Sequence, residues 1–137
     1  MNVSHGEYLN FEIPHNWIIE ENDDNTSIYD NNGEGAITLS FYTAMDIQQP
    51  FDEHISVMAK KFIDNNQIKL HHSFVLDTTN KDKLVLYGAG TASDNWFVKL
   101  WIVAKYPKIV LATYQSEKKT SEVRKVDKIL DSFQFVV

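Results

Sequence analysis

The sequence predicts an α+β domain, a three-layer α/β/α sandwich in which two helices cover a large, mainly antiparallel sheet. Most of the 137 residues alternate between apolar and polar side chains with the period of two that is typical of strands. Two segments, near residues 51–63 and 123–133, instead have the period of a helix. The linkers between the expected strands are short, which favours antiparallel neighbours. A chain of this length, with 43% hydrophobic residues, is expected to form one domain over residues 1–137.

The first third of the chain is expected to form four strands in an antiparallel meander. Leu9, Phe11 and Ile13 alternate with polar residues up to Pro14, which has no backbone N–H for a strand ladder. The other three strands are expected at residues 17–20, 27–30 and 36–42. Runs rich in Asn, Asp and Gly join them and favour tight turns.

The first helix is expected at residues 51–63, where six apolar residues form one stripe. Asp52 and Glu53 lie in its first turn, and Lys60 and Lys61 lie near its last. This order of charges complements the helix dipole.

The second half repeats the pattern of four strands and one helix. The strands are expected at residues 73–78, 84–91, 96–105 and 109–115, and the helix at 123–133 with Thr120 or Ser121 as its N-cap. Residues 133–137 add a short extended piece. The run 96–105 is apolar at almost every position, which indicates a central strand covered on both faces. The element order is therefore ββββαββββα.

Four short runs resemble the PsbP-like superfamily. They are Phe11-Glu-Ile-Pro-His-Asn-Trp17, Tyr29 before Gly33-Glu-Gly-Ala-Ile37, Val110-Leu-Ala-Thr-Tyr114 and Val126-Asp-Lys-Ile-Leu-Asp-Ser-Phe133. The superfamily includes PsbP, the Ran-binding Mog proteins, Eag-type effector chaperones and many small bacterial domains. The resemblance implies a similar element order over nearly the whole chain. It also implies a binding protein rather than an enzyme, and it carries over no catalytic residue.

Charge is divided unevenly along the chain. The first 59 residues contain 11 carboxylates and no lysine or arginine, whereas the remaining 78 contain all 13 basic residues and eight acidic ones. The net charge of −6 is therefore −11 in the first part and +5 in the second. An acidic surface attracts a basic partner. The expected partner-binding residues are Glu20, Glu21, Asp23, Asp24, Asp30 and Glu34. A solvated hairpin tip without a partner also explains the first four and is the simpler interpretation.

Two aromatic residues of the central run, Phe97 and Trp101, lie on the same face together with Val103, while Trp96, Val98, Leu100 and Ile102 lie on the other. Phe97 and Trp101 are the candidate residues of a groove for a hydrophobic ligand or peptide. Burial of both sets beneath the two helices is the more common arrangement. Gly88-Ala-Gly90 has no helix after it, so it indicates a bulge or close packing under a large aromatic side chain rather than a phosphate loop.

No cofactor, metal or catalytic residue is expected. Asp30-Asn-Asn-Gly-Glu-Gly35 matches half of a calcium loop, but Phe41 stands where the bidentate glutamate belongs. The chain has no cysteine, and its histidines lack zinc-binding spacing. A pI near 5.2 argues against nucleic acid as a partner. The longest apolar stretches, about five residues, argue against membrane insertion.

The preferred hypothesis is a non-enzymatic protein-binding module, such as an adaptor, chaperone or immunity-type protein, that binds another protein with a basic surface. The first residues lack the features of a secretory signal, so a bacterial cytoplasmic protein is expected, as a monomer or a homodimer. A mature exported form is also consistent with the composition. Two other functions remain open: a carrier for an apolar ligand or peptide, and an enzyme with a dispersed site.

Overall fold

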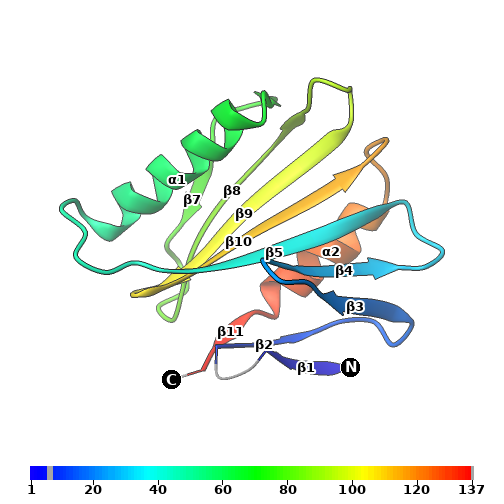
Figure 1. Cartoon of the computed structure of the whole chain (residues 1–137), viewed down its shortest axis with the longest axis horizontal. Coiled ribbons are helices and arrows are strands. Elements are labelled where there is room, and N and C mark those ends of the chain that lie inside the picture. Colours follow the sequence, from blue (N-terminus) through cyan, green and yellow to red (C-terminus); the bar gives the residue numbers. More distant parts are fainter. Residues whose placement is uncertain (6–7, 137) are drawn as a thin grey trace.

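The computed structural model describes residues 1–5 and 8–136 and has the expected α+β architecture (Figure 1). Its first strands are β1 (Asn2–His5), β2 (Leu9–Glu12), β3 (Trp17–Glu21), β4 (Thr26–Asp30) and β5 (Gly35–Thr43), followed by helix α1 (Phe51–Asn65). The second half contains β6 (Lys69–Leu70), β7 (Val75–Asp77), β8 (Leu84–Thr91), β9 (Phe97–Lys105), β10 (Lys108–Ser116), α2 (Glu122–Asp131) and β11 (Gln134–Phe135). Residue 137, the end of the expected last extended piece, lies outside the described residues.

The main sheet has eight strands, of which seven follow the order β3-β4-β5-β10-β9-β8-β6, while β7 also pairs with β8. Neighbours in this sheet are antiparallel. Strands β9 and β10 pair along their full length, from Lys105 opposite Lys108 to Phe97 opposite Ser116. The first meander therefore continues from β5 into β10, and its strands become one edge of the sheet.

Strand β2 does not belong to the main sheet, so the prediction of a four-stranded meander is wrong for its first strand. With β1 and β11, β2 forms a separate three-stranded sheet near both chain ends (Figure 1). Leu9 and Phe11 are still buried, as their alternation indicates. They pack instead beside the end of α2, where the rings of Phe11 and Phe133 lie 5.1 Å apart.

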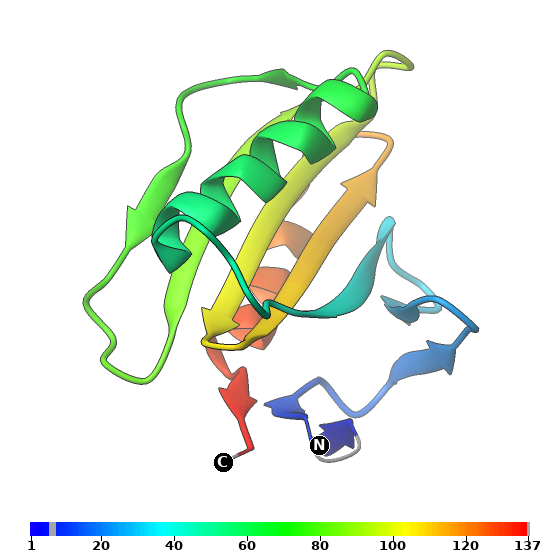
Figure 2. The same cartoon turned by 60° about the vertical axis from the view of Figure 1, so that its left-hand side comes forward.

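The two helices cover opposite faces of the main sheet, as expected (Figure 2). Ile55 of α1 belongs to a core that includes Leu100 and Ile102, whereas Val126 of α2 belongs to a core that includes Trp101. Strand β9 supplies both cores because successive side chains of a strand point to opposite faces. This confirms that the run is a central strand covered on both faces. Trp96 is an exception: it precedes β9 and is 39% exposed, because it follows the turn at Asn95.

Helix α1 ends two residues later than the apolar stripe predicts. It continues to Asn65, so Lys60 and Lys61 precede its last turn, which contains no basic residue. The chain then reverses at Gln67, which has a positive φ of 53°, and the amide of Ile68 donates to the carbonyl of Ile63. The expected match between lysines and the dipole is therefore wrong for the last turn.

Candidate functional site

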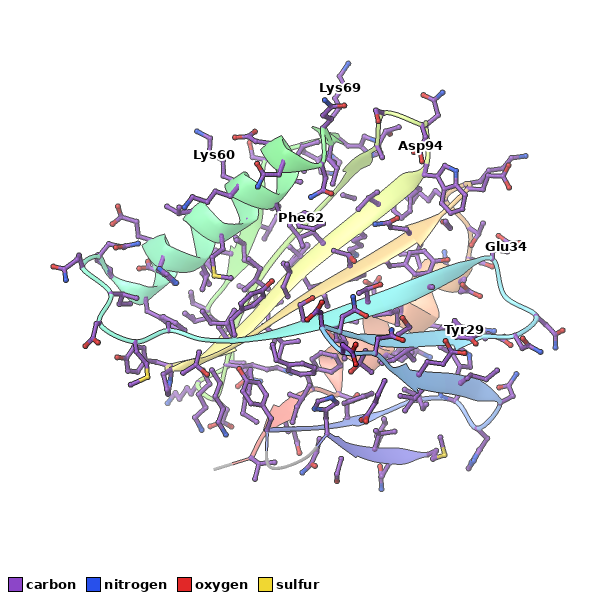
Figure 3. The ribbon with its side chains drawn as sticks, in the orientation of Figure 1. Tyr29, Glu34, Lys60, Phe62, Lys69 and Asp94 are labelled. Carbon is purple, nitrogen blue, oxygen red and sulfur yellow. The ribbon has the colours of Figure 1, made fainter. Side chains whose placement is uncertain are left out.

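The acidic candidate residues lie at the two ends of the β3–β4 hairpin. In its register, Glu21 is opposite Thr26 at one end and Trp17 is opposite Asp30 at the other. Strand β4 has five residues, so the Cα atoms of its first and last residues are about 13 Å apart. The six carboxylates therefore form two groups. We call Glu20, Glu21, Asp23 and Asp24 the acidic tip. Asp30 ends β4, and Glu34 lies in the β4–β5 turn where β5 begins (Figure 3).

The acidic tip is exposed to solvent. The Tyr29 hydroxyl donates to the Glu20 carboxylate at 2.5 Å, and this hydrogen bond raises the pKa of Tyr29. The Glu21 carboxylate lies 3.8 Å from Nε2 of His5. Within the described ranges, no lysine or arginine forms an ion pair with the tip. Its negative charge is therefore available to a partner.

The β4–β5 turn, which resembles half of a calcium loop, encloses a carboxylate of its own chain. The amide of Gly35 donates to Glu122 at 3.1 Å, and the amide of Glu34 lies 3.3 Å from the same carboxylate. The hydroxyl of Tyr114 also donates to Glu122, at 2.9 Å. A Cβ atom at Gly33 would collide with this carboxylate, so a larger residue there would displace the side chain of Glu122. This motif therefore attaches the start of α2 to the sheet.

The other candidate residues, Phe97 and Trp101, line two adjoining pockets between α2 and the β7–β8 edge of the sheet. The pocket near the start of α2 has a volume of about 690 Å³ and includes Phe97. The pocket near the end of α2 has a volume of about 540 Å³ and includes Trp101. Both include Tyr87, Lys99 and Asp127, so they form one continuous depression. We call it the α2 groove and its two parts the first and second pockets.

The groove exists because α2 does not cover the whole width of the sheet. Val85, Tyr87 and Ala89 of β8 point to the α2 face and are only half-buried. On the opposite face, the ring of Phe74 lies so close to Gly88 that a Cβ atom there would be 2.7 Å from Cδ1. The expected close packing of a glycine under an aromatic side chain is therefore confirmed for Gly88.

An ion pair separates the two pockets. Nζ of Lys99 lies 2.7 Å from Oδ1 of Asp127. The same ammonium lies 5.0 Å from the ring centroid of Trp101 and 5.6 Å from that of Tyr87. Cation–π attraction and the carboxylate both hold Lys99 across the groove floor. Phe97 and Trp101 are only 5% and 4% exposed, so the accessible floor belongs mainly to β8.

The two pockets differ in charge. The first contains His72, Lys119 and Arg124, and neither Lys119 nor Arg124 forms an ion pair within the described ranges. Apart from Lys99 and Asp127, which both pockets share, the second contains Asp77, Asp131 and Lys83. Thr79 donates to Asp77 and lowers the pKa of its carboxyl group. The groove is therefore basic at the start of α2 and acidic at its end.

Lys83 belongs to the second pocket but serves α2 itself. Its ammonium donates to the carbonyl of Asp131 at 3.0 Å and to that of Phe133 at 2.8 Å. These carbonyls lie at the C-terminal end of the helix, where a cation is favourable. Burial lowers the pKa of Lys83.

Phe97 and Trp101, the candidate groove residues, lie in the buried core beneath the groove, and the sequence did not assign Lys119 or Arg124 to the same pocket. Arg124 is exposed on α2. The structure places Arg124 and Lys119 on the first pocket. The sequence did contain a signal for the floor: Val85, Tyr87 and Ala89 alternate along β8 and therefore share one face of the sheet.

Neither a metal site nor a membrane-spanning helix is found in the described part of the chain. Over residues 1–5 and 8–136, no three His, Cys, Asp or Glu residues are grouped as metal ligands. Helices α1 and α2 are both too short and too polar to cross a bilayer.

Comparison with known proteins relates the chain to others through structure alone. No protein-family model and no curated protein matches the sequence. The solution structure of PsbP (CyanoP) from the cyanobacterium Synechocystis sp. PCC 6803 is similar, with a TM-score of 0.72 and 11% identity over 98% of this chain and 91% of that chain. The Ran-binding protein Mog1p of Saccharomyces cerevisiae has a TM-score of 0.63 and 10% identity over 99% and 95%.

A crystal structure from Bacteroides thetaiotaomicron VPI-5482 has a TM-score of 0.57 and 11% identity over 93% of this chain. This chain covers only 44% of that protein. The three structures share their fold with this chain at identities too low to transfer a function. The element order, the large antiparallel sheet and the two flanking helices agree with these structures, and the chain has the PsbP-like fold.

Proposed function

We propose that this protein is a non-enzymatic binding module that holds a segment of a partner protein in the α2 groove. The observation that supports it most is the groove itself, a depression with an apolar floor and polar rims, as ligand sites generally have. Mog1p, which has the same fold, is described as a Ran-binding protein. An adaptor, chaperone or immunity-type role in the cytoplasm, as a monomer or a homodimer, fits this proposal.

The shape of the groove favours a peptide segment over a compact molecule. It follows α2, whose ten residues correspond to a length of about 15 Å. An extended chain rises about 3.3 Å per residue, so about four or five residues fit along it. Phe97 and Trp101, the candidate groove residues, support the floor from below.

The acidic tip is a second candidate binding surface. It concentrates four exposed carboxylates, Glu20, Glu21, Asp23 and Asp24, beside a chain segment without basic residues. Such a surface steers a basic partner toward the molecule. Asp30 and Glu34 lie at the other end of β4 and are left out of this surface.

Affinity capture from an extract of the source cells, with three baits, distinguishes the two surfaces. The baits are the wild type, Ala89→Trp, which fills the first pocket, and a tip variant with Glu20→Gln, Glu21→Gln, Asp23→Asn and Asp24→Asn. Near-UV circular dichroism establishes that each bait is folded. We expect a partner that the wild type and the tip variant retain and Ala89→Trp loses. Loss with the tip variant alone would transfer the proposal to the acidic tip, and retention by all three would refute both.

A further inference from the structure

We propose that the α2 groove binds an extended acidic segment, with carboxylates on Lys119 and Arg124 and an apolar side chain on Tyr87 and Ala89. This inference rests on the proposed function and specifies the chemistry of the ligand. It also specifies a direction, because only the first pocket accepts the acidic residues.

The charge of the first pocket carries this inference. Among the described residues that line it, the lysines and arginine are Lys99, Lys119 and Arg124, and the only carboxylate, Asp127, is paired with Lys99. Two permanent cations therefore remain without an anion in the described structure, within a protein whose net charge is −6. Arg124 can bind a carboxylate through two parallel hydrogen bonds. The N-terminal end of α2, which adjoins this pocket, adds a partial positive charge.

The floor of the same pocket is suited to an apolar side chain of the ligand. Val75, which lines it, is 45% exposed, and Tyr87 and Ala89 are half-buried. Successive side chains of an extended peptide point in opposite directions. A segment that alternates acidic and apolar residues therefore places its apolar side chains on the floor and its carboxylates at the rim.

The second pocket restricts the acidic residues to one end of the ligand. Lys99 and Asp127 neutralise each other there, and Lys83 is bound to carbonyls at the end of α2, so Asp77 and Asp131 leave this pocket with a net negative charge that disfavours carboxylates of a peptide. The residues beyond Lys99 are therefore expected to be uncharged. Charge complementarity selects an acidic–apolar peptide over a basic one and over a purely apolar molecule.

Fluorescence anisotropy with two labelled peptides tests the inference. The acidic probe is acetyl-Glu-Val-Glu-Val-Ser-Val-Ser-Val-amide, and the basic probe has lysine in place of glutamate. We expect the wild type to bind the acidic probe, with an affinity that falls as salt is raised, and to leave the basic probe unbound. Lys119→Glu with Arg124→Glu should weaken binding of the acidic probe about tenfold or more.

The matched control is Lys118→Glu with Lys125→Glu, which has the same net charge but alters exposed lysines outside the first pocket. It should retain most of the wild-type affinity. Equal losses in the two double variants, binding of the basic probe, or no binding of the acidic probe would overturn the inference. If the acidic probe fails while Ala89→Trp still loses the cellular partner, the proposed function stands and only the ligand chemistry is wrong. If Ala89→Trp changes neither the binding of the acidic probe nor the capture of the partner, the proposed function and the ligand chemistry are both wrong.

Discussion

Replacing Glu122 by alanine should destabilise the protein strongly, because three donors depend on its carboxylate. These are the amides of Glu34 and Gly35 and the hydroxyl of Tyr114, and Glu122 itself is only 8% exposed. A hydrogen bond to a charged group contributes about 1.5–3 kcal/mol, but the amide contacts are long and water can reach part of the site. We therefore expect a loss of about 3–4 kcal/mol, a large part of the roughly 5–15 kcal/mol that stabilises a domain.

Urea denaturation followed by tryptophan fluorescence measures this loss. Glu122→Gln retains the volume and one acceptor, so it should lose only about 1–2 kcal/mol. Glu117→Ala, at an exposed glutamate just before α2, is the control and should stay within about 0.5 kcal/mol of the wild type. A loss below about 1 kcal/mol in Glu122→Ala, or one equal to that of the control, would refute the view that the β4–β5 turn is organised around this carboxylate.

Three further predictions concern groups beside this turn and the groove. Burial and the hydrogen bond to Glu122 raise the pKa of Tyr114 from 10.0 to about 12, which favours its neutral form in the folded state. The stabilisation of the folded state by neutral Tyr114 is complete below pH 10 and is lost as the pH rises toward 12. In urea titrations at each pH, the free energy of unfolding of Tyr114→Phe should therefore fall less over that interval than that of the wild type. Gly90→Ala should cost more than Gly88→Ala, about 2–3 against about 1 kcal/mol, because its Cβ would meet the backbone of Lys69, whereas at Gly88 it meets the ring of Phe74, which can turn. Equal losses on thermal unfolding would contradict this. Lys83→Met should remove the cation at the end of α2 and cost about 1–2 kcal/mol, while Lys81→Met, at an exposed position, should change the urea midpoint little.

The positions of most strands and both helices could be predicted because the spacing of apolar residues indicates which face of each segment is buried. The same spacing does not indicate which strands pair with one another. Leu9 and Phe11 show the same pattern whether β2 joins the main sheet or the small one, since both arrangements bury one face. The pairing of β5 with β10 likewise depends on contacts between residues about 70 positions apart, such as Leu39 and Ala112. Strand β6, with two residues, is too short for a periodic signal.

The candidate site was predictable to the same extent. Phe97 and Trp101 could be assigned to one face of a central strand from their spacing alone. The position of Arg124 beside the first pocket could not be predicted, because it depends on how α2 packs across β9 and β10. The local sequence shows that Arg124 is off the apolar stripe, but it does not show whether solvent or a pocket lies beside it.

The order of the strands places the acidic tip and the basic first pocket on separate parts of the surface. The acidic tip belongs to β3, at one edge of the main sheet, whereas the basic pocket lies beside β8, near the other edge. Five strand spacings of about 4.8 Å separate β3 from β8, or about 24 Å, which is about three times the Debye length at physiological ionic strength. The two surfaces should therefore act independently. The tip variant should bind the acidic probe with nearly the wild-type affinity at physiological salt, and a clear gain in affinity would show that the tip and the groove belong to one electrostatic surface.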